Sequence, residues 1–315
     1  MPRRDDLKTI LVLGSGPIKI GQAAEFDFSG SQAVQALRED GYKVILVNSN
    51  PATIQNDPEM ADKVYIEPLL PDTIKRIMEI ERPDALLAGM GGQTALNIAS
   101  ELAHAGVLDE LGIELIGSDL DAIDKAEDRD LFNRVCQEID LPISDAIACN
   151  SISDVLSAAE EIGSWPILIR PAFTLGGLGG GTAWDTGQLV EIATLGLRNS
   201  RIGQVLIEES ILGWQEYEYE VMRDGSDNAT IVCTMENIDP MGVHTGESTV
   251  VAPVQSLSDR DHMQLRDMSL SLIRKLNIKG GCNVQFAVNQ STGEVRVIEV
   301  NPVSYTHLRA HETRH

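Results

Sequence analysis

The chain has 315 residues, of which 43% are hydrophobic and 23% charged, as is ordinary for a water-soluble protein of two or three domains. A formal net charge of −23 leaves no excess of Lys and Arg to bind a nucleic acid, so we expect no nucleic-acid partner. The four cysteines are widely spaced, which argues against a zinc ribbon or a disulfide framework. No cleavable apolar leader and no run of 18 apolar residues occurs, so we expect a cytoplasmic protein with no membrane partner.

Strands and helices are expected to alternate over roughly the first 120 residues. The expected strands are 9–13, 43–47, 84–88 and 114–116, and the expected helices are 31–40, 72–81 and 93–105. Such alternation predicts an open parallel sheet with helices on both faces. Ligands bind such sheets at the carboxyl ends of the strands, so the loops 14–21, 48–56 and 89–94 are expected to share one edge.

The first of these loops differs from a dinucleotide-binding loop in two ways. Lys19 stands where the third glycine of the motif would be, and the second strand ends in Asn48 instead of the acidic residue that binds a ribose. An NAD site is therefore disfavoured.

A charged segment and a glycine-rich loop follow. The segment 119–138 is predicted to be one solvated helix, in which Arg129 would form a surface ion pair. After a helix at 153–162 and a strand ending at Ile169, the loop begins with Arg170 and has five glycines between 176 and 181. Glycine lets backbone N–H groups approach a phosphate, although a flexible surface hairpin explains this loop equally well.

The rest of the chain has the pattern of a mostly antiparallel lobe starting near Gln204. The expected elements are strands 205–208, 216–223, 230–236, 283–288 and 295–300 and a helix at 259–275, with Gly225 and Gly293 in the turns of two hairpins. Alternation puts Glu216, Glu218 and Glu220 on one face of a strand. That face is exposed if it is only structural, and one carboxylate is functional if it lines a ligand site.

Oxygen-bearing side chains gather near the end of this pattern. Glu299 and Asn301 leave the same face of a strand, and Gln285 lies on the preceding one. Mg²⁺ accepts such ligands and keeps positions for water and phosphate oxygens. Together with the glycine-rich loop they indicate ATP. Neither a Walker A motif nor a kinase catalytic loop is present.

At this point the sequence resembles the amino-terminal part of the large subunit of carbamoyl phosphate synthetases, which are ATP-grasp ligases. The similar segments are GSGPIKIGQ (14–22), NSNPATI (48–54), MGGQTALN (90–97), AIDKAEDR (122–129), RPAFTLGG (170–177), MGVHTG (241–246) and NVQFAV (283–288). The resemblance extends from Met1 to Pro302.

The resemblance implies an α/β fold, with an open parallel-sheet pre-ATP-grasp domain followed by a two-lobed ATP-grasp α+β domain. The implied boundaries are 1–125 for the first domain, 126–203 for the lobe with the glycine-rich loop and 204–302 for the lobe with the metal site. Residues 303–315 hold three of the six histidines and lack the family's arginines, so they are expected to be a foreign tail, and the 315-residue piece is expected to turn over poorly.

The resemblance also implies roles for particular residues. Arg129 and Arg170 would contact ATP phosphates, which the loop at Gly176 and Gly177 would cover. Glu209 and Ile211 would hold the adenine, and Glu216 the ribose. The nucleotide site would further include Gly242, Val243 and His244. Gln285, Glu299 and Asn301 would hold two divalent metals, Mg²⁺ or Mn²⁺.

The implied reaction is the ATP-dependent, glutamine-dependent synthesis of carbamoyl phosphate. This half would phosphorylate bicarbonate, and carboxyphosphate would react with ammonia from a glutaminase small subunit to give carbamate. Catalysis would be mainly electrostatic, with metals and arginines neutralising the transferring phosphoryl group. The alternatives are another ATP-grasp carboxylase or ligase, such as a biotin carboxylase, and a non-catalytic nucleotide-binding module.

Overall fold

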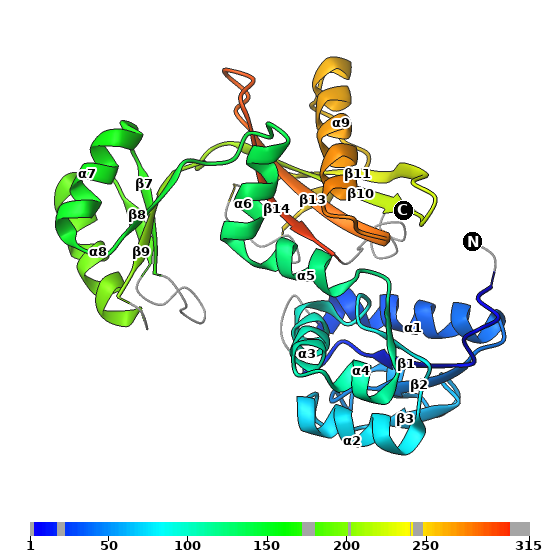
Figure 1. Cartoon of the computed structure of the whole chain (residues 1–315). Helices are drawn as coiled ribbons and strands as arrows, with labels where there is room; N and C mark the ends of the chain where they lie inside the picture. Colours follow the sequence, from blue (N-terminus) through cyan, green and yellow to red (C-terminus); the bar gives the residue numbers. More distant parts are fainter. Residues whose placement is uncertain are drawn as a thin grey trace.

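The computed structural model describes residues 3–17, 23–171, 180–200, 203–239, 241 and 248–302. Within these ranges the strands form three sheets, of which the first is parallel and the other two antiparallel (Figure 1). The predicted mixed α/β fold with an open parallel sheet first is therefore confirmed. No helix in the described ranges is both long and apolar enough to cross a membrane.

The parallel sheet has the order β3-β2-β1-β4-β5. Its strands are β1 (Thr9–Leu13), β2 (Lys43–Val47), β3 (Lys63–Tyr65), β4 (Ala85–Leu87) and β5 (Glu114–Ile116), and the helices beside it are α1 (Ala23–Glu39), η1 (Ile54–Asn56), α2 (Pro71–Glu81), α3 (Gly92–His104) and α4 (Val107–Leu111). Alternate residues of β1 enter different cores: Leu11 packs with α2 and α3, whereas Val12 packs with Val34 of α1. Both faces of the sheet are thus covered by helices, as expected.

Helix α1 begins at Ala23, so the predicted range of 31–40 was wrong at its start. Gly30, which reads as a loop residue, lies in the helix interior. A Cβ at Gly30 would come within 2.6 Å of the Gln55 side chain, so the glycine admits this side chain against the helix. The sequence pattern showed the glycine but not the neighbour that requires it.

The prediction of a single helix over 119–138 was also wrong. Two helices form, α5 (Leu120–Glu127) and α6 (Arg129–Glu138), because Asp128 is extended between them. Asp119 caps α5 by accepting from Ala122 N, and Asp128 caps α6 by accepting from Leu131 N. Aspartate is a strong N-cap, so the second one begins a new helix.

The middle sheet in chain order, which lies at the left in Figure 1, is smaller and has the order β6-β9-β7-β8. It comprises β6 (Ala146–Cys149), β7 (Ile167–Pro171), β8 (Gly181–Ala183) and β9 (Val205–Glu209), with helices α7 (Ile152–Ile162) and α8 (Thr186–Asn199). The placement of the 205–208 strand in the last lobe was wrong, because β9 pairs with β6 and β7. Sequence alternation identifies a strand but not its partner.

The last sheet has the order β12-β11-β10-β13-β14. Its elements are β10 (Gln215–Arg223), β11 (Ala229–Asn237), β12 (Val250–Val251), β13 (Gly280–Val288), β14 (Val295–Asn301) and the helix α9 (Asp259–Lys275). Gly225 and Gly293 lie in the two expected hairpin turns, between β10 and β11 and between β13 and β14. The predicted helix at 259–275 is confirmed at both ends, and Ser258 caps its start by accepting from Asp261 N.

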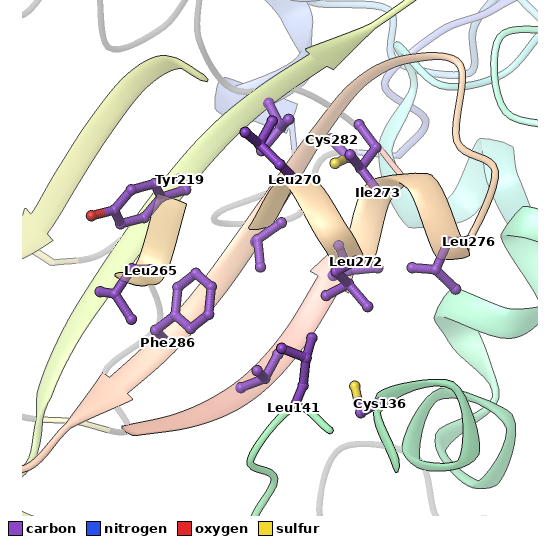
Figure 2. Close-up of a cluster of buried hydrophobic side chains, with 14 of the residues drawn as sticks. Cys136, Leu141, Tyr219, Leu265, Leu270, Leu272, Ile273, Leu276, Cys282 and Phe286 are labelled. Carbon is purple, nitrogen blue, oxygen red and sulfur yellow. The ribbon is translucent and has the colours of Figure 1, made fainter. Parts of the chain in front are cut away.

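One face of this sheet packs against α9 and α6. Tyr219 and Phe286 meet edge to face with ring centroids 5.7 Å apart beneath α9. Figure 2 shows Cys136 of α6 and Leu141 on the same side of the sheet as Leu272 of α9. The opposite face of the sheet is therefore available for polar side chains.

Candidate functional site

Three glutamates of β10 point away from the helix-covered face of the last sheet. Tyr217, Tyr219 and Val221 fill the core below, so Glu216, Glu218 and Glu220 lie on the other face. These three side chains are only 6%, 0% and 0% exposed. The expectation of an exposed face was therefore wrong, and the alternative, in which one of these carboxyl groups serves a ligand site, stays a prediction.

Amide side chains cross-link these carboxyl groups. Asn283 Nδ2 donates to Glu218 Oε2 at 2.8 Å and to Glu220 Oε1 at 2.9 Å, and Asn237 Nδ2 donates to Glu218 Oε1 at 3.3 Å. The Oδ1 atoms of Asn237 and Asn283 are buried and have no hydrogen-bond partner among the described residues. Two buried carbonyl oxygens without a donor beside carboxyl groups suit a cation.

The predicted metal ligands lie next to this cluster. Gln285 of β13 pairs across the ladder with Glu299 of β14, and Asn283 pairs with Asn301. Asn301 Nδ2 donates to Glu299 Oε1 at 3.0 Å, which directs the Asn301 carboxamide oxygen away from that carboxylate. The structure thus brings Gln285, Glu299 and Asn301 together, as expected from their spacing.

These residues fit a hard divalent cation such as Mg²⁺. The set offers one carboxylate and amide oxygens, and Asn283 Oδ1, which has no hydrogen-bond partner among the described residues, lies two residues before Gln285 on β13. In the described parts of the chain, no three His, Cys, Asp or Glu side chains gather as a metal site. A cation held by few protein carboxylates keeps positions for water and substrate phosphates, as Mg²⁺ does.

A β-bulge adds a basic residue to the same face. The pairing of β13 and β14 shifts between Gln285 and Phe286, so Arg296 pairs with Ala287 while Glu299 pairs with Gln285. Simple alternation would put positions 296 and 299 on opposite faces, so the sequence did not predict Arg296 on this face. The buried Val295, Val297 and Val300 break the period of two, and that break was the available signal.

Arg296 links β14 to the end of β9. Its Nε and Nη2 donate to Glu209 Oε2 and Oε1 at 3.0 and 3.3 Å, and both side chains are 19% exposed. Its guanidinium also lies 5.4 Å from the ring centroid of Trp214. Ile211 lies between these contacts, in the chain that joins β9 to β10, and its carbonyl accepts from Trp214 N at 3.1 Å.

The predicted phosphate-binding residue Arg170 lies near the end of β7. Its half-exposed side chain places Nε 3.2 Å from Oε2 of the buried Glu208 on β9. A buried carboxylate fixes the direction of a guanidinium fork while its remaining donors stay available for a ligand.

Several predicted site residues lie outside the described residues. These are Gly176 and Gly177 of the glycine-rich loop, Leu178, and Gly242, Val243 and His244. Arg129 begins α6, and its side chain is not described. Their proposed roles stay predictions.

The three loops of the first sheet meet at one edge, as expected. Gly16 N donates to the buried Asn48 Oδ1 at 2.9 Å, and a Cβ on Gly91 would lie 2.4 Å from Gly14 O. A Cβ on Gly89, in the turn after β4, would lie 3.4 Å from the carbonyl oxygen of Pro302. The loop edge of the first sheet therefore adjoins the end of the strand that carries Glu299 and Asn301.

Comparison with solved structures places this architecture in the ATP-grasp fold. The biotin carboxylase of Campylobacter jejuni aligns with a TM-score of 0.75 over 95% of this chain and 66% of that one, at 19% identity. The biotin carboxylase domain of the Hydrogenobacter thermophilus 2-oxoglutarate carboxylase gives a TM-score of 0.72 at 18% identity, over 95% of this chain and 64% of that one.

Sequence comparison identifies the family within that fold. The carbamoyl phosphate synthase preATP-grasp domain matches residues 6–125, and the ATP binding domain of the carbamoyl-phosphate synthase L chain matches residues 128–310. The chain therefore belongs to the family of carbamoyl phosphate synthase large chains. Large chains from Methanothrix thermoacetophila and Nostoc sp. are 57% and 55% identical over 96% of this chain. The chain spans only about 28% of the length of these relatives.

Proposed function

We propose that this chain is the bicarbonate-phosphorylating part of a glutamine-dependent carbamoyl phosphate synthase. The observation that carries the proposal is the cross-strand set of Gln285, Glu299 and Asn301 beside the buried Asn283 amide. Carboxyphosphate formed here would react with ammonia, supplied by a glutaminase subunit, to give carbamate. The structure from H. thermophilus holds MgADP and bicarbonate on a similar fold, which supports both ligands for this site.

Two divalent ions, Mg²⁺ or Mn²⁺, would be held by Gln285, Glu299 and Asn301. Divalent cations supply positive charge that offsets the charge on the transferring phosphoryl group. The site needs the positive charge of these cations, because the net charge of −23 and the three buried glutamates of β10 disfavour the binding of a triphosphate.

The remaining residues would position the nucleotide. Arg170, oriented by Glu208, would donate to phosphate oxygens near the glycine-rich loop at Gly176 and Gly177. Arg129, Gly242, Val243 and His244 would contact the nucleotide, and the Glu209–Ile211 segment and Glu216 would hold the base and the ribose. His244 is assigned to binding, because phosphoryl transfer requires little from a general base.

Bicarbonate-stimulated ATP hydrolysis in an intact parent enzyme tests this proposal. We expect Glu299→Gln to lower the stimulated rate by about 100-fold or more, since the variant removes the set's only carboxylate. Glu294→Gln is the matched control, because Glu294 is exposed in the turn of the same hairpin. Its rate should equal that of the wild type.

Three outcomes would count against the proposal. Unchanged turnover in Glu299→Gln would refute the metal assignment. ATP binding without any bicarbonate-stimulated hydrolysis would indicate a nucleotide-binding module, and stimulation by a different acceptor would indicate another ATP-grasp ligase.

A further inference from the structure

The chain between β9 and β10 joins the middle sheet to the last sheet. For residues 210–214, the described hydrogen bonds all close within the segment: Leu212 N donates to Ser210 Oγ at 3.3 Å, and Trp214 N to Ile211 O at 3.1 Å. Gly213 has a φ of +81°, which favours glycine. The segment is a tight local turn, and its hydrogen bonds do not fix its place relative to the sheet.

One side chain contacts both ends of this turn. Arg296 binds Glu209 through two nitrogens and its guanidinium lies over the ring of Trp214, so it contacts both ends of the segment 209–214, called the 209–214 turn below. A planar guanidinium can make the bidentate contact and the aromatic contact at once, whereas an ammonium cannot. Arg296 therefore sets both the direction and the span of the turn.

Arg296 and the metal ligands share one strand face. Arg296 lies three residues before Glu299 on β14, and the bulge puts both on the polar face. The cross-strand row of Arg296 continues through Ala287 to Glu216 of β10. Strand β14 thus fixes the distance between Glu299, a proposed metal ligand, and Arg296, which contacts the 209–214 turn.

We propose that Arg296 is a positioning residue for the purine base of the nucleotide. It holds the 209–214 turn at a fixed place relative to Gln285 and Glu299. The base and the phosphates of one nucleotide can then be bound at the same time. This inference rests on the proposed function, in which the turn binds the adenine. Arg296 is not a catalytic residue, because it acts through Glu209 and Trp214.

Binding of two ligands separates this role from a general loss of structure. Mg²⁺ with ATP probes base and phosphates together, and Mg²⁺ with tripolyphosphate probes the phosphate end alone, both measured by calorimetry on the 315-residue chain. For Arg296→Ala we expect the Kd of ATP to rise about tenfold and the Kd of tripolyphosphate to change less than about twofold. Arg296→Lys should recover only part of the ATP affinity, since it keeps charge but loses the fork.

Arg274→Ala is the matched control. Arg274 of α9 forms an ion pair with Asp227 at 3.2 Å, away from the β9–β10 turn, so neither Kd should change. Hydrogen exchange of residues 210–215 without nucleotide gives a second readout. It should speed up in Arg296→Ala and stay unchanged in Arg274→Ala.

The outcomes distinguish the two proposals. If Arg296→Ala raises the Kd of both ligands equally, or leaves the Kd of ATP unchanged, the positioning role is overturned, whereas the proposed nucleotide site is not. Exchange in the turn that is the same in Arg296→Ala and wild type would also overturn it. A wild-type chain that binds neither ligand would overturn the proposed nucleotide site itself, and the positioning role with it.

Discussion

Asn283 donates a hydrogen bond of 2.8 Å to Glu218, and both side chains are fully buried. The same Nδ2 also donates to Glu220 at 2.9 Å, so one amide serves two buried carboxyl groups. Removing a donor from buried carboxyl groups exposes part of the cost of their desolvation. This amide is therefore central to the stability of the polar face.

We expect Asn283→Ala to lower the free energy of unfolding by about 2–3 kcal/mol, because Glu218 and Glu220 lose a shared donor. Urea denaturation measures the change. The control is Asn97→Ala, which alters an exposed asparagine on α3 that bonds only Gln93 among the described residues. Losses of similar size in the two variants would contradict a special role for Asn283.

Much of the fold follows from local sequence signals. The helix from Asp259 to Lys275 was predicted at both ends, and the structure shows a local N-cap, Ser258, at its start. The placement of Gln285, Glu299 and Asn301 side by side was predicted because Glu299 and Asn301 are two residues apart on one strand. Such features depend on neighbours in the chain.

Two of the errors arose where distant contacts decide the structure. Strand β9 pairs with β6 and β7, which lie far from it in sequence, so alternation alone put it in the wrong sheet. Arg296 reached the polar face through a bulge that only the pairing of β13 with β14 reveals. Both features lie at the predicted nucleotide site, where irregular structure is common.

The contact of Gly91 with Gly14 gives a second prediction. A Cβ at Gly91 would meet Gly14 O at 2.4 Å, Leu13 O at 2.5 Å and Ala95 Cβ at 2.6 Å. Two of these atoms belong to the backbone and cannot rotate away, so we expect Gly91→Ala to destabilise the first domain by about 2–4 kcal/mol. Thermal unfolding measures the effect.

Gly225→Ala is its control, since a Cβ there meets no atom within 4 Å and its φ is not positive. It should change stability by less than about 0.5 kcal/mol. If Gly91→Ala is equally mild, the close approach of the first and third loops is wrong.

The carboxylate of Glu81 gives a prediction about pH. It accepts hydrogen bonds from Lys63 Nζ and from Tyr65 Oη at 2.6 Å, and the Lys63 bond chiefly lowers its pKa below the usual range. A lowered pKa stabilises the fold above about pH 4.5, and this contribution is lost as the pH falls through the folded-state pKa. Glu81→Gln should therefore cost about 1–2 kcal/mol at neutral pH and progressively less in acid.

Urea titrations at a series of pH values measure that difference. Glu79→Gln on the same helix is the control, because it makes the same substitution at an exposed position. A difference between Glu81→Gln and wild type that grows in acid would reverse the assigned sign.

The cysteines give the last prediction. Burial raises the pKa of Cys136 to about 12 and that of Cys149 to about 11, and it raises the pKa of Cys282 well above its usual value. The thiolate is the reactive form, so at about pH 8 these three should react with a disulfide reagent far more slowly than the partly exposed Cys233. Mass spectrometry of the labelled native chain should show one rapidly labelled cysteine, and Cys233→Ser should remove it. In urea all four cysteines should react. Fast labelling of Cys136 in the native chain would refute its burial against α9.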